Sequence, residues 1–107
     1  MTKFLVLYHA AESARAQMAT ATPEQAKAGM DAWMAWAGKA GDAVVDLGAP
    51  LGEGVVIGGG ASDDAAGFSI LQAPSQDAVE QLLGDHPHLH MPGGSITVHE
   101  LLSPPGM

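Results

Sequence analysis

The chain has no cysteine and only four lysine and arginine residues among its 107. Without thiols it can form neither a disulfide framework nor a thiolate metal site, and a cysteine nucleophile is excluded. The absence of cysteine fits a protein of the reducing cytoplasm. Twelve acidic residues against four basic ones give a formal net charge of −8, which repels nucleic acid and anionic membrane surfaces. We therefore expect no nucleic-acid partner and no membrane partner.

Long apolar segments are also missing. No stretch approaches the roughly 20 continuous apolar residues that a membrane-spanning helix needs. The N-terminal segment reaches Glu12 and Arg15 without the long apolar region of a signal peptide. With 47% hydrophobic residues the chain can bury a core, and its length suits one domain over residues 1–107. The sequence thus predicts a single cytoplasmic domain.

What is present is a regular succession of strand and helix signals. Thr22 and Gln25 have the spacing of a capping box, so the main helix begins there and ends near Gly41. Ser75 opens a second helix that Gly84 closes. The predicted strands span residues 3–9, 44–49, 68–73 and 95–102, with a weak helical segment at 10–20 and a glycine-rich connection at 50–67 that has room for one small strand.

The order of these elements is strand, helix, strand, strand, helix, strand, which is a split βαβ arrangement. Right-handed crossovers place both helices on one face of a four-stranded antiparallel sheet, so the predicted fold class is α+β with ferredoxin-like βαββαβ topology. In the first and last strands, apolar residues occupy both odd and even positions. Both faces of the sheet therefore carry apolar side chains, and the second face also needs a cover. We expect a second copy to provide it in a homodimer. A loop over this face is the alternative.

The main helix has apolar residues at the spacing of one buried stripe. This stripe predicts the helix's core residues: Ala26, Met30, Trp33, Met34 and Ala37. Trp36 lies off the stripe, and we expect it on the helix surface or in the dimer interface.

Four of the five histidines lie in residues 85–102, DHPHLHMPGGSITVHELL. Histidine titrates near neutral pH and is the commonest protein metal ligand, so the cluster points to a functional site. His86, His88 and His90 alternate, and in an extended backbone they would point to one side. They can converge on a metal ion, although Pro87 interrupts regular pairing. For His86 the alternative is a cap on the preceding helix, whose C-terminal dipole favours a partly positive imidazole.

The strand order also predicts an acid-base site. The first and last strands are neighbours in a split βαβ sheet, so His9 at the end of the first approaches His88 or His90 before the last. Two imidazoles in a half-buried pocket disfavour each other's charged forms, which keeps one neutral as a proton acceptor. His9 and His90 are therefore the predicted catalytic residues, with His88 binding the substrate. The alternative is that His9 only satisfies a backbone group at a strand end.

Further candidates for substrate binding are aromatic or acidic. Tyr8 and Trp33 can line a slot for a planar ligand, although Trp33 also has core spacing. Asp46 lies within an apolar strand, where a carboxylate is costly unless it faces a cavity or an exposed edge. His99 lies on the opposite side of its strand from Glu100, and we expect it in the dimer interface.

Three segments, KFLVLYHA, GFSILQAPSQDAVEQLL and HPHLHMPGGSITVHEL, span most of the chain. With them the chain resembles the YCII-related family, in particular its DGPF-type branch. The resemblance implies a single YCII-related domain that forms a dimeric α+β barrel. Members of the wider family carry a histidine and an aspartate on the first long helix as a proposed acid-base pair. Gln25 and Lys39 stand at about those places here, and the DGPF tetrapeptide is missing.

The resemblance implies a scaffold that hosts dehydrochlorinases, and in the larger superfamily cofactor-free monooxygenases and haem enzymes. The histidines favour binding of a small cyclic or aromatic molecule with acid-base chemistry, an elimination or an isomerisation, that needs no cofactor. The alternative is a non-catalytic dimeric binding or interaction module in which the histidines are structural.

Overall fold

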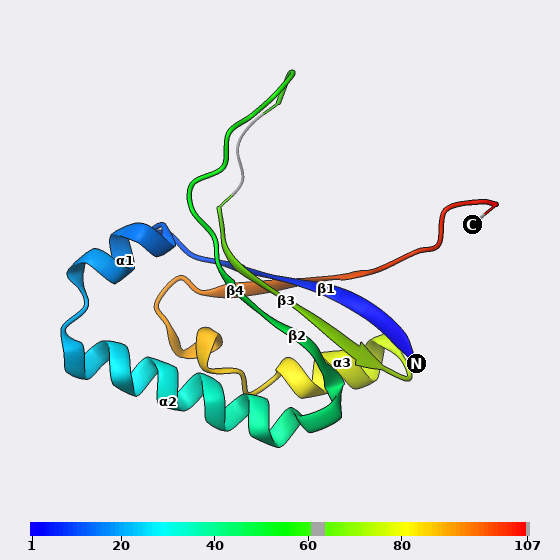
Figure 1. Cartoon of the computed structure of the whole chain (residues 1–107), viewed down its shortest axis with the longest axis horizontal. Helices are drawn as coiled ribbons and strands as arrows, with labels where there is room; N and C mark the ends of the chain where they lie inside the picture. Colours follow the sequence, from blue (N-terminus) through cyan, green and yellow to red (C-terminus); the bar gives the residue numbers. More distant parts are fainter. Residues whose placement is uncertain (61–63, 107) are drawn as a thin grey trace.

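The computed structural model describes residues 1–60 and 64–106. Within them, four strands form one antiparallel sheet in the order β2-β3-β1-β4 (Figure 1). The strands are β1 (Thr2–His9), β2 (Val44–Pro50), β3 (Ala65–Ala73) and β4 (Ser95–Glu100). The helices are α1 (Ala14–Thr20), α2 (Pro23–Ala40) and α3 (Gln76–Leu83), with short 3-10 turns η1 (Gly41–Ala43) and η2 (Pro87–His90). The predicted α+β fold of ferredoxin-like topology is confirmed.

The helix ends lie where their capping residues predict them. The backbone N–H of Gln25 donates to Thr22 Oγ1 at 3.1 Å, and the N–H of Thr22 donates to Gln25 Oε1 at 3.0 Å. Gly41 follows α2 with a φ of 58°, a conformation that glycine adopts without strain. Ser75 Oγ accepts from the N–H of Ala78 at 3.2 Å at the start of α3. Local hydrogen bonds thus decide where both helices begin.

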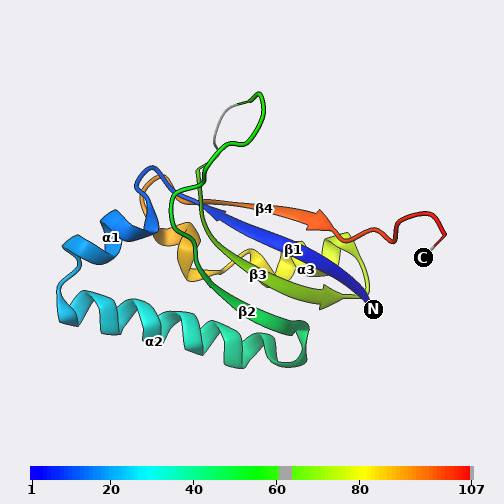
Figure 2. The same cartoon turned by 45° about the horizontal axis from the view of Figure 1, so that its top comes forward.

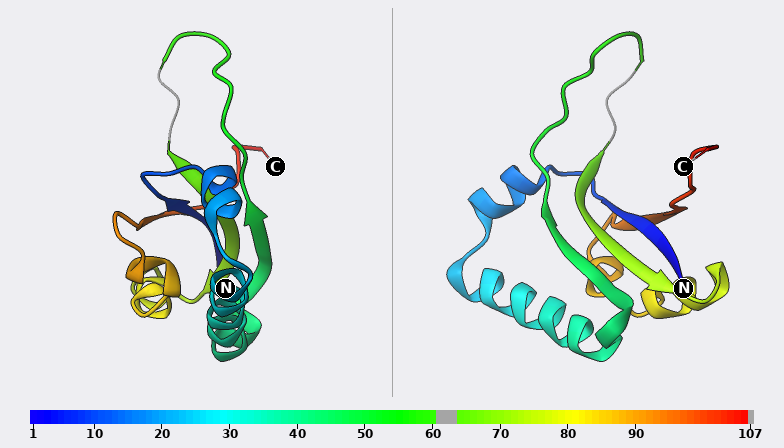
Figure 3. Two further views of the ribbon diagram at one scale, coloured as in Figure 1. Left: turned by 90° about the vertical axis from the view of Figure 1, so that its left-hand side faces the viewer. Right: turned by 45° about the vertical axis from the view of Figure 1, so that its right-hand side comes forward.

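The core lies between the sheet and the helices α2 and α3, which both cover one face of the sheet (Figures 2 and 3). The core residues are Phe4, Val6, Tyr8, Trp36, Leu71, Ala73, Val79 and Leu83. Trp36 is only 5% exposed, and its Nε1–H donates to the carbonyl of Leu82 at 3.0 Å, which ties α2 to α3. None of the described helices is long and apolar enough to cross a membrane.

The predicted buried stripe of α2 is wrong in part. Met30 and Met34 are 61% and 52% exposed, whereas Trp33 and Ala37 pack against the core as predicted. The buried face of α2 is the one that carries Trp36, which was predicted to lie on the helix surface or in the dimer interface. Two overlapping stripes with helical spacing share Trp33 and Ala37, and the position of α2 over the sheet selects the one that buries the second indole.

The connection between β2 and β3 projects from the body of the protein (Figure 1). Its described residues 51–60 contain no strand, so the small strand allowed there does not form in them. Val55, Val56 and Ile57 are 87%, 43% and 94% exposed. The N–H of Leu51 donates to the carbonyl of Ala66 at 3.0 Å, which holds the base of the connection against β3.

The second face of the sheet points away from the helices. Leu5 and Leu7 of β1 lie opposite Ile70 and Phe68 of β3, and all four side chains are partly exposed. We name the surface formed by these four residues the open face. In the described part of the chain no helix packs on it. A partly buried apolar surface of this kind is typical of an interface.

Candidate functional site

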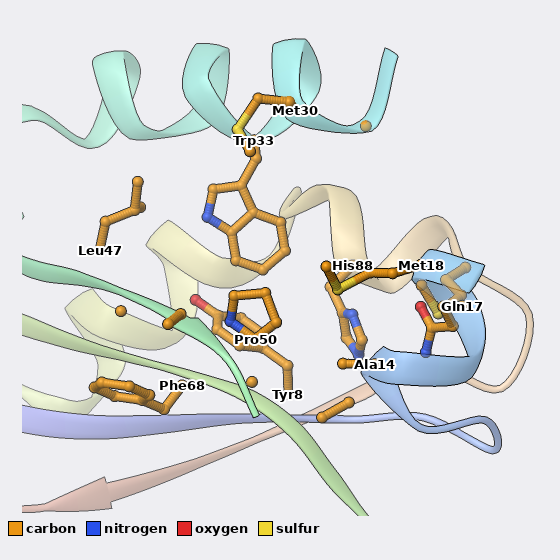
Figure 4. A pocket seen from close by; sticks show the side chains of 16 residues that line it. Tyr8, Ala14, Gln17, Met18, Met30, Trp33, Leu47, Pro50, Phe68 and His88 are labelled. Carbon is orange, nitrogen blue, oxygen red and sulfur yellow. The ribbon is translucent and has the colours of Figure 1, made fainter. Parts of the chain in front are cut away.

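A cavity of about 290 Å³ lies between α1, α2 and the sheet. Met18 of α1, Met30 and Trp33 of α2 and Leu47 of β2 make its wall largely apolar. Polar side chains from Tyr8, Gln17 and His88 also line it, and Figure 4 shows those of Tyr8 and His88 between the sheet and α2, with Gln17 on α1. An apolar hollow with a few polar groups is the usual form of a small-molecule site.

His88 is held at the cavity wall by a hydrogen bond that also sets its tautomer. Its Nε2 lies 2.7 Å from the backbone carbonyl of His9. Because a carbonyl only accepts, Nε2 carries the hydrogen, and Nδ1 of the neutral ring keeps its lone pair. Residues 1–60 and 64–106 provide no hydrogen-bond partner for Nδ1. This nitrogen can accept a proton from a molecule in the cavity.

Tyr8 belongs to a hydrogen-bond chain that starts at the cavity wall. Its hydroxyl donates to Ser69 Oγ at 2.8 Å, and the Ser69 hydroxyl donates to the carbonyl of Leu47 at 2.6 Å. Burial raises the pKa of Tyr8, and the hydrogen bond with Ser69 opposes this rise only in part. The phenol therefore stays protonated near neutral pH, and its oxygen keeps lone pairs for a ligand hydroxyl.

Five aromatic rings pack together beside the cavity, and those of Tyr8, Trp33 and His88 line it. Tyr8 meets Trp33 edge to face at 4.8 Å between ring centroids and stacks on His86 at 5.0 Å. His86 also lies edge to face against Trp33 at 4.5 Å and Trp36 at 4.4 Å. His88 approaches Tyr8 at 5.4 Å. Such packing restricts the rotation of each ring and presents a flat apolar wall.

His86 is fully buried within this cluster. Its Nδ1 accepts from the backbone N–H of His88 at 3.0 Å, so the proton of the neutral ring is on Nε2. Nε2 has no hydrogen-bond partner among the described residues. Burial lowers the pKa of His86 to about 4, and the charge that His88 carries when it is protonated adds to the effect. The predicted cap on α3 by a partly positive imidazole is wrong, because His86 caps η2 in its neutral form.

The predicted ligand-binding residues are divided by the structure. Tyr8, Trp33 and His88 all line the cavity. Asp46 does not, because its Oδ1 accepts from the N–H of Gly48 at 2.8 Å in an exposed turn of the edge strand β2. Asp46 therefore occupies an exposed position on the edge strand, which was the alternative interpretation of this residue.

The two predicted catalytic histidines lie outside the cavity. The His9 ring points to the side of the sheet opposite the helices, where Nδ1 lies 2.6 Å from Asp64 Oδ1 and Nε2 2.9 Å from Thr97 Oγ1. His90 is exposed at the end of η2. The predicted meeting of two imidazoles is wrong, because His88 reaches the carbonyl of His9 and not its ring. Adjacent strand residues point to opposite faces, so Tyr8 and His9 cannot share one site.

A metal centre is not assembled by the histidine cluster. Among the described residues no three histidine, aspartate or glutamate side chains lie together as metal ligands. The 3-10 turn of η2 replaces the extended backbone that would have aligned His86, His88 and His90.

Comparison with known proteins supports the fold and adds one neighbour. No protein-family model matches the chain, and no curated protein sequence matches it. The solved structure of 5-chloro-2-hydroxyhydroquinone dehydrochlorinase from Burkholderia phenoliruptrix, in complex with 2,5-dihydroxybenzoquinone, is similar. The two chains are 17% identical with a TM-score of 0.57, over 95% of this chain and 94% of that one. The likeness shows the fold. That neighbour is an enzyme with a small ligand bound.

Several residues that line the cavity or hold its wall were not predicted from the sequence. Ser69 is fully buried in β3 and receives the Tyr8 hydrogen bond. Its signal was available, because a serine at an inward position between Phe68 and Ile70 needs a buried partner. Met18 and Met91 line the cavity from α1 and from the loop after η2. Neither carries a local signal, since only the tertiary structure brings these two distant segments to one cavity.

Proposed function

We propose that the chain binds a small planar molecule with hydroxyl or carbonyl groups in the cavity between α1, α2 and the sheet. The observation that carries this proposal is that the polar side chains of Tyr8, Gln17 and His88 line a largely apolar cavity. Trp33 offers an aromatic surface beside them, which suits a ring-shaped ligand. The cavity volume of about 290 Å³ favours a ligand with a single ring.

The chemistry that this arrangement supports is acid-base catalysis without a cofactor, as an elimination or an isomerisation. His88 Nδ1 accepts a proton from the ligand, and the electron pair of the broken bond forms a new double bond. The leaving group then departs with its electron pair, or His88 returns the proton to another atom of the ring. The Tyr8 hydroxyl holds a ligand oxygen during this exchange. The similarity in fold to a dehydrochlorinase supports this reaction class.

We further propose that the chain is a homodimeric member of the YCII-related family. The three matching sequence segments and the similarity in fold support the family. The open face supports the dimer, since Leu5, Leu7, Phe68 and Ile70 form a continuous apolar surface across two central strands. In this proposal the second copy packs on that surface.

Titration with 2,5-dihydroxybenzoquinone tests the proposed site. Trp33 at the cavity wall provides a fluorescence signal, and calorimetry gives the dissociation constant. We expect His88→Gln and Tyr8→Phe each to weaken binding by roughly fivefold to tenfold, the effect of one lost hydrogen bond. His90→Gln is the matched control on the same 3-10 turn, and it should bind as the native chain does. No binding by the native chain, or equal loss in the His90 variant, would contradict the proposal.

A turnover assay distinguishes an enzyme from a non-catalytic binding module. A chlorinated hydroxyhydroquinone is added to the native chain, and released chloride is measured against time. The proposed reaction predicts chloride release that falls by a factor of roughly 100 or more in the His88→Gln variant, the usual contribution of a general base. Binding without chloride release in the native chain would rule out the elimination and support the non-catalytic module.

A further inference from the structure

The polar and apolar groups of the cavity between α1, α2 and the sheet are arranged in an unusual order. Tyr8 and His88, which supply two of its polar side chains, are only 2% and 6% exposed and lie at its floor. Met18 and Met30 line the same cavity but are 68% and 61% exposed. In Figure 4 both methionines lie toward α1 and α2, whereas the Tyr8 ring lies nearer the sheet. The cavity is therefore polar inside and apolar where it meets the solvent.

The exposed part of the cavity wall, which we name the rim, carries no charge. Its members are Met18, Gly29, Met30, Ala49 and Pro50. Among the described residues that line the cavity there is no aspartate, glutamate, lysine or arginine. Exposed apolar groups above buried polar ones reverse the ordinary distribution, and an exposed apolar surface at a hollow is typical of a ligand-binding site.

We propose that the ligand is a single ring that carries an aliphatic chain, bound with the polar ring inward. This inference rests on the proposed function and adds the class of ligand. The hydroxyl or carbonyl groups of the ring meet Tyr8 and His88 at the floor, and the chain leaves the cavity over Met18 and Met30. A ring with a charged substituent in place of the chain would lose the contact with the rim and would find no opposite charge in the cavity wall.

Methionine suits a chain that leaves the cavity. Its unbranched side chain has three rotatable bonds and a polarizable sulfur, so it adapts to apolar groups of different shape. The cavity of about 290 Å³ has room for one ring, so a chain of several carbons must extend over the rim. Each methylene of that chain removes apolar surface of the ligand and of the thioethers from water, and a fully buried methylene strengthens binding by roughly fourfold.

The rim stays accessible in the proposed homodimer. The cavity lies on the side of the sheet that faces the helices, whereas the open face lies on the other side (Figure 3). A second copy packed on the open face therefore leaves Met18 and Met30 to the solvent and to the ligand.

Calorimetric titration of the native full chain with resorcinol and its 5-methyl, 5-propyl and 5-pentyl derivatives tests the proposal. We expect each added methylene to strengthen binding by about twofold to threefold, because a chain at the rim is only partly buried. Met30→Asp should make the affinity nearly independent of chain length, and Met30→Leu should keep the dependence. Met34→Asp is the matched control, since Met34 is 52% exposed one turn further along α2 and does not line the cavity.

The ring and the chain have separate contacts, so their effects are separable. His88→Gln should weaken binding of all four compounds by the same factor, roughly fivefold to tenfold, and should leave the dependence on chain length unchanged. Met30→Asp should bind resorcinol itself about as the native chain does. The floor thus sets the affinity for the ring, and the rim sets the gain per methylene.

Three results would overturn the proposal. These are affinities of the native chain that do not rise with chain length, equal loss of the dependence in Met30→Asp and Met34→Asp, and a changed mass of Met30→Asp in sedimentation equilibrium. The last result would assign the rim to a contact between copies. Resorcinol that binds without any effect of chain length would leave the proposed cavity function intact, whereas failure of both resorcinol and 2,5-dihydroxybenzoquinone to bind would refute both proposals.

Discussion

At the scale of single residues, two adjacent positions of one strand serve different surfaces. Tyr8 and His9 follow each other in β1, yet the phenol faces the cavity and the imidazole faces the other side of the sheet. The histidine that reaches the cavity is His88, which approaches from the loop before β4. Strand alternation was readable from the sequence, whereas the position of the η2 turn was not.

His86 makes the stability of the fold depend on pH. The imidazole is neutral when folded, with a pKa of about 4, against an ordinary value of 6.5 in the unfolded chain. Between these values the unfolded state binds a proton that the folded state does not, so this stabilisation is present above the unfolded pKa and is lost as the pH falls. The loss amounts to roughly 3 kcal/mol at most.

Urea unfolding at a series of pH values checks this prediction. The free energy of unfolding of the native chain should fall from about pH 7 to about pH 4. In His86→Phe the unfolding free energy should be lower near neutral pH but should fall less steeply with acid. His90→Asn, which changes an exposed imidazole, should retain the native slope. A His86→Phe variant with the native slope would show that other groups cause the dependence.

At the scale of elements, Gly48 shows how one residue shapes a strand. It has a φ of 82° within the register shift between Asp46 and Ala49, and a Cβ there would overlap the backbone carbonyl of Phe68. The bulge lets Leu47 face the core while Asp46 turns back to bond the Gly48 amide. The edge strand can therefore line the cavity only with glycine at this place.

Substitution of glycine by alanine has opposite effects in β2 and α2. We expect Gly48→Ala to lower the free energy of unfolding by about 2 kcal/mol or more, because both the positive φ and the contact with Phe68 oppose a side chain. Gly38→Ala in α2 should raise it by about 0.5–1 kcal/mol, since nothing lies within 4 Å of the added atom. Chemical denaturation measures both. Equal effects of the two substitutions would contradict this account of β2.

At the scale of the whole molecule, the open face predicts the state of association. Sedimentation equilibrium of the native chain should give the mass of two copies. Leu7→Asp places a charge in the middle of the open face and should yield a folded monomer, with circular dichroism confirming the fold. Met34→Asp is the control on an exposed helical position, and it should remain dimeric. A native chain that is monomeric at all concentrations would refute the proposed dimer.

Much of the architecture was predictable because its signals are local. The capping box at Thr22 and the serine cap at Ser75 set the helix starts through hydrogen bonds within four residues. The strand order followed from the handedness of the two crossovers. The face of α2 that is buried was not predictable, because two stripes with helical spacing compete and only packing against α3 and the sheet selects Trp36.

The amino-acid sequence by itself determined the order of strands and helices, the negative charge and the place where the histidines gather. These properties depend on composition and on contacts between residues near in the chain. Only the tertiary structure decided which histidine lines the cavity and which joins Asp64 and Thr97. The rings of His9 and His88 are each oriented by hydrogen bonds to groups more than fifty residues away in the chain. No local sequence pattern specifies such a partner.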